Sequence, residues 1–199
     1  MSYAIIGFGK IGHALAKAFA RKGIEVSVAT TRDPKSFAAD AAGIGPMVLP
    51  KTLAEAAKAD IIFLAVHFES HSDVARALPS WQGKIIVDVT NAYGVPPEKL
   101  GGQPSSKAVE RAFTGASLVK GFNHLVAGVL DQDPGVHGGK RVVFLASDDD
   151  SAADQIGGLA ETLGFAPIKL GALSEGGLLV QARGNSWGRL IFKDLVKFD

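Results

Sequence analysis

The sequence predicts an α/β fold in which helices flank a doubly wound, mostly parallel sheet. Short apolar and β-branched segments alternate with alanine-rich segments of helical spacing, which is the order that βαβ units produce. Several of the short segments are apolar throughout, as strands covered on both faces are. The 199 residues, 47% of them hydrophobic, can bury a sizeable core but are too few for a second large domain. We therefore expect residues 1–199 to form a single domain.

The apolar segments predict a series of strands. In chain order they are Tyr3–Ile6, Glu25–Ala29, Met47–Leu49, Ile61–Val66, Ile85–Val89, Leu118–Phe122, Val142–Ala146 and Ala166–Lys169. Between the first two, Lys10–Lys22 is expected to be helical. Ile11, Leu15 and Phe19 would share one face of that helix, and Gly23 suits its C-terminal stop.

Three further helix starts can be recognised. Asp33 before Pro34 is typical of an N-cap followed by proline in the first helical position. Thr52 and Glu55 match a capping box. The run Asp148–Asp150 precedes another helical segment, and we interpret its carboxylates as caps that oppose the helix dipole. A metal site is the alternative, but no histidine or further acid follows at ligand spacing.

Two segments leave alternatives open. The stretch 94–106, rich in glycine and proline, is expected to be the longest loop, either a lid over a site or an irregular surface connection. The segment 185–198 carries apolar residues on more than one helical face, among them Trp187, Ile191, Val196 and Phe198. These residues would form either a homodimer contact or a surface that packs back on the sheet.

Composition excludes several kinds of site and partner. The chain has no cysteine, which excludes disulfides, thiolate nucleophiles and cysteine-based metal sites. The 21 Lys and Arg residues nearly balance the 20 Asp and Glu residues, so the net charge of +1 predicts no nucleic-acid or membrane-surface binding. No apolar run approaches the roughly 18 residues that cross a bilayer. We expect a soluble, cytoplasmic protein without a metal site.

The strongest motif is the glycine-rich segment Gly7, Phe8, Gly9, Lys10, Ile11 and Gly12. It follows an apolar strand and opens an amphipathic helix, which is the context that gives a G-x-G-x-x-G pattern its meaning. The glycines permit a tight turn, close approach of the backbone to a pyrophosphate, and close packing of helix on strand. The motif predicts a Rossmann-type dinucleotide-binding fold. A structural turn without a ligand is the alternative.

The end of the second strand indicates which dinucleotide is bound. NAD-binding domains place an acid there to bind the ribose 2′-hydroxyl, whereas this strand ends in Thr30, Thr31 and Arg32. Hydroxyls and a guanidinium suit a 2′-phosphate, and Lys35 adds a further positive charge. We therefore expect NADP(H) in preference to NAD(H). The alternative is a solvated arginine beside an ordinary turn.

The ends of later strands supply candidate groups for the reacting rings. Ala65, Val66 and His67 end one strand, Asn91 follows the next, and Asn123 and His124 follow the one after. Ligands of doubly wound sheets bind beyond these carboxyl ends. The two amides could hold a nicotinamide carboxamide or the edge of a flavin-like ring. His67 and His124 are the candidates for proton handling, and a packed or solvated histidine is the alternative for His124. Asp88 is expected to bind backbone amides.

Several motifs together resemble a known family. They are Ala-Ile-Ile-Gly-Phe-Gly-Lys-Ile-Gly at 4–12, Thr-Thr-Arg at 30–32, Val-Asp-Val-Thr-Asn at 87–91 and Val-Lys-Gly-Phe-Asn at 119–123. In this order they resemble the coenzyme F420-dependent NADP oxidoreductases, and the cytoplasmic domains of the STEAP ferric reductases are similar to the same group. The resemblance implies hydride transfer between NADPH and a deazaflavin or flavin that lies against the nicotinamide.

The resemblance also implies roles for individual positions. Gly7–Ile11 would contact the dinucleotide, Thr31 and Arg32 its 2′-phosphate, and Ala65 and Val66 its ribose and nicotinamide. Asn123, His124, Leu125 and Val126 would line the place where the rings meet. The F420-reducing pattern has His-Thr-Ile-Pro at these four positions, so this chain lacks its histidine and its proline. The departure leaves F420, a flavin, a quinone or another small-molecule electron acceptor open.

Two other functions remain as alternatives to a flavin- or F420-type reductase. The first is a non-catalytic NADP(H)-binding module that senses redox state through a partner protein. The second is a dehydrogenase of a small imine or hydroxy acid. Enzymes of that second kind usually add a helical domain to complete the substrate pocket, for which this chain has little room.

Overall fold

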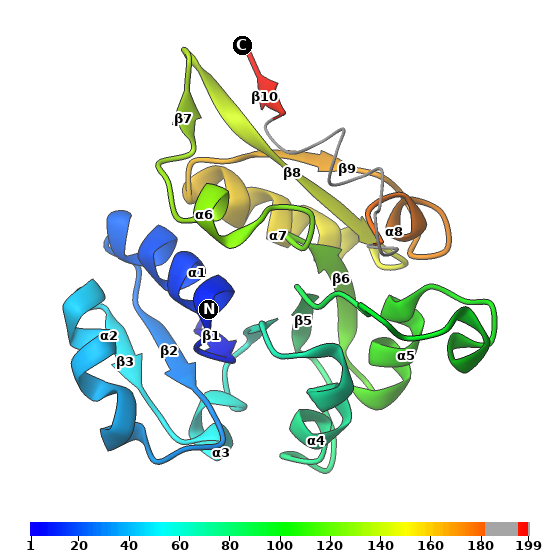
Figure 1. Cartoon of the computed structure of the whole chain (residues 1–199), viewed down its shortest axis with the longest axis horizontal. Helices are drawn as coiled ribbons and strands as arrows, with labels where there is room; N and C mark the ends of the chain where they lie inside the picture. Colours follow the sequence, from blue (N-terminus) through cyan, green and yellow to red (C-terminus); the bar gives the residue numbers. More distant parts are fainter. Residues whose placement is uncertain (182–194, 199) are drawn as a thin grey trace.

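The computed structural model describes residues 1–181 and 195–198. Its strands are β1 Tyr3–Ile6, β2 Val26–Ala29, β3 Val48–Pro50, β4 Ile61–Leu64, β5 Ile85–Asp88, β6 Ser117–Gly121, β7 Gly135–Val136, β8 Gly139–Ser147, β9 Ala166–Lys169 and β10 Val196–Lys197. They form one sheet in the order β10-β8-β6-β5-β4-β1-β2-β3, and β7 and β9 also pair with β8 (Figure 1).

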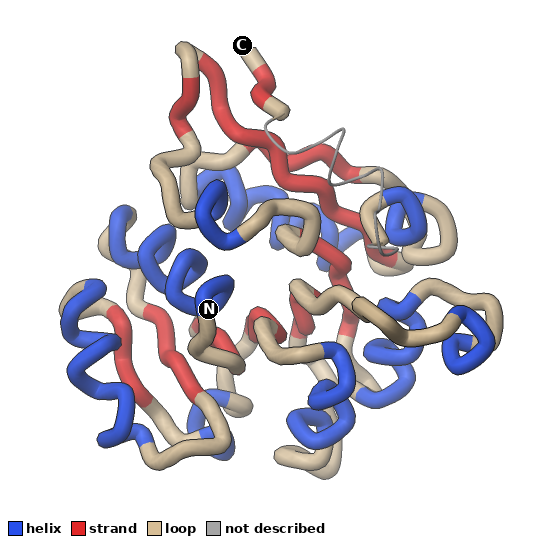
Figure 2. The backbone as a smooth tube through the Cα atoms, viewed as in Figure 1, coloured by secondary structure: helices blue, strands red, loops and turns tan. Residues whose placement is uncertain are grey.

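Helices lie on both sides of the strands (Figure 2). The α-helices are α1 Lys10–Arg21, α2 Ala38–Ile44, α3 Leu53–Ala56, α4 His71–Ala75, α5 Ser105–Ala112, α6 Ala127–Leu130, α7 Asp150–Thr162 and α8 Gly176–Leu179. The described residues also form three short 3₁₀ helices, η1 Pro34–Phe37, η2 Phe68–Ser70 and η3 Pro97–Leu100.

The sheet topology confirms the predicted fold class. Strands β3, β2, β1, β4, β5 and β6 are parallel neighbours in that order. This is the strand order of a doubly wound Rossmann sheet. Strand β8 is antiparallel to β6 and parallel to β9, so the sheet is mostly rather than wholly parallel. The two-residue strands β7 and β10 both pair antiparallel with β8.

Alternate residues of the central strands face two separate cores. Ile5, Phe63 and Val87 belong to the core on the side of α1, α6 and α7. Ile62 and Ile86, one position away along β4 and β5, belong to the core on the side of α3, α4 and α5. The alternation is the two-residue period of a pleated strand. Both faces are buried, which explains why these strands are apolar throughout.

The expected helix ends are observed, with one difference. Gly23 follows α1 with φ of 65°, and Thr52 forms the capping box of α3 with Glu55. Asp149 caps α7 by accepting a hydrogen bond from the amide of Ala152 at 3.1 Å. Asp148 points elsewhere, since its carboxylate accepts from the Leu173 amide and pairs with Lys107. The described residues hold no cluster of three or more potential metal ligands.

The segment predicted as one long loop at 94–106 is shorter than expected. It contains η3, and α5 already begins at Ser105. Proline at 104 precedes the first helical residue, where it costs no hydrogen bond. The connection between β5 and α5 is therefore broken into turns and a short helix.

Much of the predicted C-terminal apolar segment lies outside the described residues. Trp187 and Ile191 are among these, so the homodimer contact stays a prediction. Val196 lies in β10 and pairs with Arg141 of β8, and Phe198 is 61% exposed. Within 1–181 and 195–198, no helix has the length and apolar character needed to span a membrane.

Candidate functional site

The predicted glycine loop has the backbone geometry that its sequence requires. Gly7 adopts φ of 102°, and its amide donates to the carbonyl oxygen of Ala29 at 2.9 Å. A Cβ on Gly7 would overlap the backbone of Ala65, and one on Gly12 would overlap the carbonyl of Gly7. The end of β1, the end of β4 and the first turn of α1 therefore touch through backbone atoms, which only glycine allows.

The N-terminus of α1 is open beside this loop. Gly9 is its N-cap, and within the described part of the chain no side chain caps the helix. A Cβ on Gly9 would meet no atom of residues 1–181 or 195–198 within 4 Å, in contrast to Gly7 and Gly12. The amides of the first helical turn have no partner within the helix, and the helix dipole is positive at this end. The arrangement suits a phosphate group.

Two side chains of the predicted phosphate loop lie differently from each other. Phe8 is buried, stacks on His13 with ring centroids 4.0 Å apart, and lies 5.8 Å from Phe37. Its ring anchors the loop in the core. Lys10 is exposed at the start of α1, next to the partly buried Ile11.

The tip of β2 presents exposed positive charge. Thr30 Oγ1 accepts a hydrogen bond from the Arg32 amide at 3.0 Å, which shapes the turn. The Arg32 guanidinium lies 5.7 Å from the centre of the Phe37 ring. Arg32, Lys35 and Thr31 are exposed, and neither cation forms an ion pair with another described residue. Both charges are available to a ligand.

The two predicted amides lie side by side. The Asn91 Nδ2 donates to the Asn123 carbonyl at 2.9 Å, and the Asn123 Nδ2 donates to Asn91 Oδ1 at 3.0 Å. Asn123 also donates to the carbonyl of Val180, just beyond α8, at 2.8 Å. Its buried Oδ1 has no hydrogen-bond partner among the residues that the structure describes. Phe122, with φ of 61°, makes the turn that places Asn123 here.

The two histidines considered for proton handling are in opposite environments. His124 is buried, its Nε2 lies 3.2 Å from the carbonyl oxygen of Val142, and its ring packs against Phe144. Burial lowers the pKa of His124 to about 4, although the Val142 carbonyl opposes the shift. Its imidazole is therefore neutral at neutral pH. His67 is exposed at the N-cap of η2.

The remaining predicted residues flank these groups. Ala65 and Val66 are partly buried at the end of β4, where the Ala65 amide donates to the Ile6 carbonyl at 2.8 Å. Leu125 is buried below the loop that follows β6, whereas Val126 is 39% exposed.

A buried ion pair under the amides was not anticipated. Asp88 and Lys120 are register partners in β5 and β6, with Lys120 Nζ 3.1 Å from Asp88 Oδ2. Asp88 Oδ1 accepts from the Thr90 amide at 2.9 Å, which confirms the expected contact with a backbone amide. Burial lowers the pKa of Lys120, and Asp88 opposes that shift. The sequence feature that could have indicated this ion pair is Lys120 itself, a single lysine within an otherwise apolar strand.

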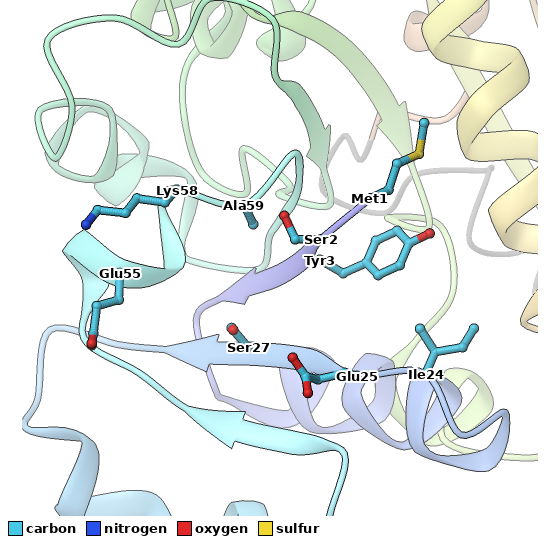
Figure 3. A pocket seen from close by; sticks show the side chains of 9 residues that line it. All are labelled: Met1, Ser2, Tyr3, Ile24, Glu25, Ser27, Glu55, Lys58 and Ala59. Carbon is cyan, nitrogen blue, oxygen red and sulfur yellow. The ribbon is translucent and has the colours of Figure 1, made fainter.

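Two cavities differ in where they lie relative to the carboxyl ends of the parallel strands. A groove of about 440 Å³ opens beside the phosphate loop, between α1 and α6. Its lining residues are Phe8, Gly9, Lys10, His13, Lys17, Ala127, Gly128 and Asp131. The other cavity, about 380 Å³, lies at the amino ends of β1 and β2, where Tyr3 and Glu25 line it (Figure 3). Because doubly wound sheets bind ligands at the carboxyl ends of strands, the groove belongs to the candidate site.

Comparison with known proteins supports a particular family. Residues 2–92 match the sequence profile of a family described as coenzyme F420-dependent NADP oxidoreductase. A hypothetical protein from Sinorhizobium meliloti is 36% identical, with a TM-score of 0.89 over 100% of this chain and 96% of that one. A proposed F420-dependent NADP-reductase from Arthrobacter sp. FB24 is 30% identical, with a TM-score of 0.71 over 90% of both chains.

Longer proteins also contain a similar segment. The metalloreductase STEAP3 of Rattus norvegicus is 30% identical over 175 residues, which is 85% of this chain and 34% of that protein. The human metalloreductase STEAP2 is 33% identical over 87% of this chain and 34% of its own length. The chain thus spans about a third of the length of the curated relatives that it matches.

Proposed function

Because the chain belongs to the coenzyme F420-dependent NADP oxidoreductase family, we propose that it binds NADP(H) and transfers a hydride between the nicotinamide and a flat electron acceptor. The acceptor class is a deazaflavin, a flavin or a similar small molecule. The proposal concerns this chain, not the complete activity of the longer STEAP relatives.

The observation that carries the proposal is the open N-terminus of α1 beside a basic strand tip. Gly7 and Gly12 let the backbone close tightly, while the space beside Gly9 is free for a pyrophosphate. The exposed guanidinium of Arg32 and the ammonium of Lys35 then suit a 2′-phosphate. Together these features fit NADP(H) better than NAD(H).

The proposed chemistry depends on positioning. Bound NADPH supplies the hydride, and the protein must align the donor and acceptor rings and keep water away. Asn91 and Asn123 are proposed to orient the rings, since their amides are fixed to each other at the end of the sheet. The Oδ1 of Asn123 is buried without a hydrogen-bond partner among the described residues, so the loop after β6 must shift before a carboxamide can donate to it.

His124 is proposed to hold the loop that carries Asn123 in place. Its imidazole is neutral at neutral pH and packs between Val142 and Phe144. A neutral, buried ring holds the loop after β6 in place and is poorly suited to donate a proton. Hydride transfer itself needs no strong acid in contact with the nicotinamide.

The groove between α1 and α6 supports an approach route for the acceptor. It begins at Phe8 and Gly9, next to the expected pyrophosphate, and runs along α1 to Lys17 and Asp131. Lys17 and Asp131 form an ion pair of 2.8 Å at its far end. An acceptor in this groove would lie next to a dinucleotide bound across the edge.

The test is anaerobic oxidation of NADPH by the purified protein with F420, FMN, FAD, a quinone or a ferric chelate, and with NADH in parallel. We expect turnover with NADPH and at least one flat acceptor, and much weaker turnover with NADH. Tight NADPH binding without turnover on any acceptor would contradict the enzyme and favour a non-catalytic NADP(H)-binding module. Failure to bind NADPH would contradict both.

A further inference from the structure

The ion pair between Lys120 and Asp88 is buried almost completely, with 1% and 0% of the two side chains exposed. Lys120 Nζ also donates to the carbonyl oxygen of Thr90. Removing two charges from water is costly, and apolar replacements of buried pairs are often no less stable. Stability alone therefore gives little reason to keep this pair, and its contacts deserve a functional explanation.

The contacts of the pair all converge on the segment that precedes Asn91. Asp88 Oδ1 accepts from both the amide and the hydroxyl of Thr90, at 2.9 and 2.7 Å. Lys120 binds the other side of the same residue through its carbonyl. Thr90 is thus held at three atoms, and Asn91 is the next residue in the chain.

The same pair also fixes the second amide. Lys120 is three residues before Asn123, and it ties β6 to β5 at the last register pair between the two strands. Asn91 and Asn123 then bind each other reciprocally above it. The ion pair and the paired amides therefore set the distance between the two loops together.

We propose that Lys120 is a positioning residue, which acts through Asp88 and Thr90 to hold Asn91 and Asn123 where they orient the nicotinamide ring. The inference rests on the proposed function, because it requires a dinucleotide at this edge. Lys120 itself is too deeply buried to contact the dinucleotide.

The test compares Lys120→Met with a matched control, Lys84→Met. Lys84 also donates to two backbone carbonyls, those of Lys58 and Ala59 at 2.8 Å each, but at the amino end of β5. The affinity for NADPH and the emission and anisotropy of the bound nicotinamide are measured by fluorescence titration. This readout needs no acceptor and does not respond to a loss of stability alone.

We expect Lys120→Met to keep NADPH affinity within a few-fold, because the pyrophosphate and 2′-phosphate contacts are remote from it. The bound nicotinamide should nevertheless lose anisotropy and emit more like free NADPH. With an acceptor that supports turnover, kcat should fall by roughly 10- to 100-fold, as expected for a ring displaced by about an ångström. Lys120→Arg should restore part of both signals, and Lys84→Met should change neither.

Each contrary outcome has a separate meaning. Wild-type nicotinamide signals in folded Lys120→Met would overturn the inference and leave the proposed function standing. A wild-type protein that does not bind NADPH would overturn the proposed function and the inference with it. Should Lys120→Met not fold, Thr90→Val removes the hydroxyl contact to Asp88 alone. Unchanged nicotinamide anisotropy in that variant would overturn the inference.

Discussion

Single residues at the carboxyl edge divide into exposed charges and buried neutral groups. Arg32 and Lys35 face solvent at the tip of β2, where a phosphate can reach them. Asn123 and His124 are buried at the end of β6. The division matches the two ends of a dinucleotide, one highly charged and the other an aromatic ring with a carboxamide.

The exposed guanidinium of Arg32 is expected to determine which dinucleotide binds. Arg32→Ala should weaken NADPH binding by tenfold or more, because a charge-assisted hydrogen bond contributes about 1.5 to 3 kcal/mol. NADH binding should barely change, since NADH has no 2′-phosphate. Isothermal titration with both dinucleotides checks this, with Arg76→Ala as a control at an exposed arginine at the C-cap of α4. Equal losses for the two dinucleotides would contradict the assignment.

Burial of His124 is expected to make the fold sensitive to acid. Its pKa of about 4 in the folded protein lies below the ordinary 6.5, so the unfolded chain binds the proton more readily. The contribution of neutral His124 to the free energy of unfolding should be fully present above pH 6.5. It should decrease below that value and be lost as the pH falls through 4. The full loss is roughly 3 to 4 kcal/mol, because the pKa falls from 6.5 to about 4 and one pKa unit corresponds to about 1.4 kcal/mol.

Urea unfolding at pH 7 and pH 4.5 measures this effect. His124→Gln cannot take up the proton and should lose less free energy of unfolding than the wild type between the two values. His67→Gln, a change at an exposed histidine, should behave like the wild type. A His124→Gln variant with the wild-type pH dependence would show that His124 does not cause it.

Some residues of the site could be predicted from sequence, and others could not. Asp88 was expected to bind a backbone amide because an acid at a strand end has few other partners. No role could be predicted for Lys120, because its partner Asp88 lies in another strand. A sequence pattern does not show which strands are neighbours in the sheet. The burial of His124 likewise depends on β8, which follows it in the chain and folds back over it.

At the scale of elements, the turn between β1 and α1 separates structural from ligand-binding glycines. Gly12→Ala is expected to destabilise the protein by several kcal/mol, because its Cβ would overlap the Gly7 carbonyl. Gly9→Ala should leave the melting temperature nearly unchanged, since its Cβ meets nothing within 4 Å. It should nonetheless impair NADPH binding, because the Cβ would occupy the space expected for the pyrophosphate.

Thermal unfolding and NADPH titration of the two glycine variants test this contrast. Gly23→Ala, at the end of α1, is the control for general strain, because Gly23 has φ of 65° and no neighbour that a Cβ would meet. Unimpaired NADPH binding by Gly9→Ala would place the pyrophosphate elsewhere.

Elements were predicted best where local chemistry determines them. Each of the central strands was expected within one or two residues, because a buried parallel strand must be apolar. The N-caps Thr52 and Asp149 were recognisable from their own side chains. The length of β8 and its antiparallel direction were not, because both depend on pairing with β6, β7 and β10. The residue pattern of β8 alone does not show which strands will form backbone hydrogen bonds with it.

At the scale of the whole molecule, the carboxyl edge brings together segments that are far apart in the chain. The phosphate loop, the tip of β2 and the ends of β4, β5 and β6 meet there because these strands are parallel. Val180, the residue after α8, adds its carbonyl oxygen from a segment late in the chain. The sequence could indicate that strand ends would converge, but not that Val180 would join them.

The central position of β1 also has a consequence for synthesis on the ribosome. β1 is made first, yet one of its two neighbours is β4, which emerges only after β2 and β3. Pairing of such distant segments requires loop closure, so it is slow. The Gly7 amide can bind Ala29 once β2 has been made, but the backbone of Gly7 also packs against Ala65 at the end of β4. A nascent chain therefore completes its phosphate loop only after β4 has left the exit tunnel.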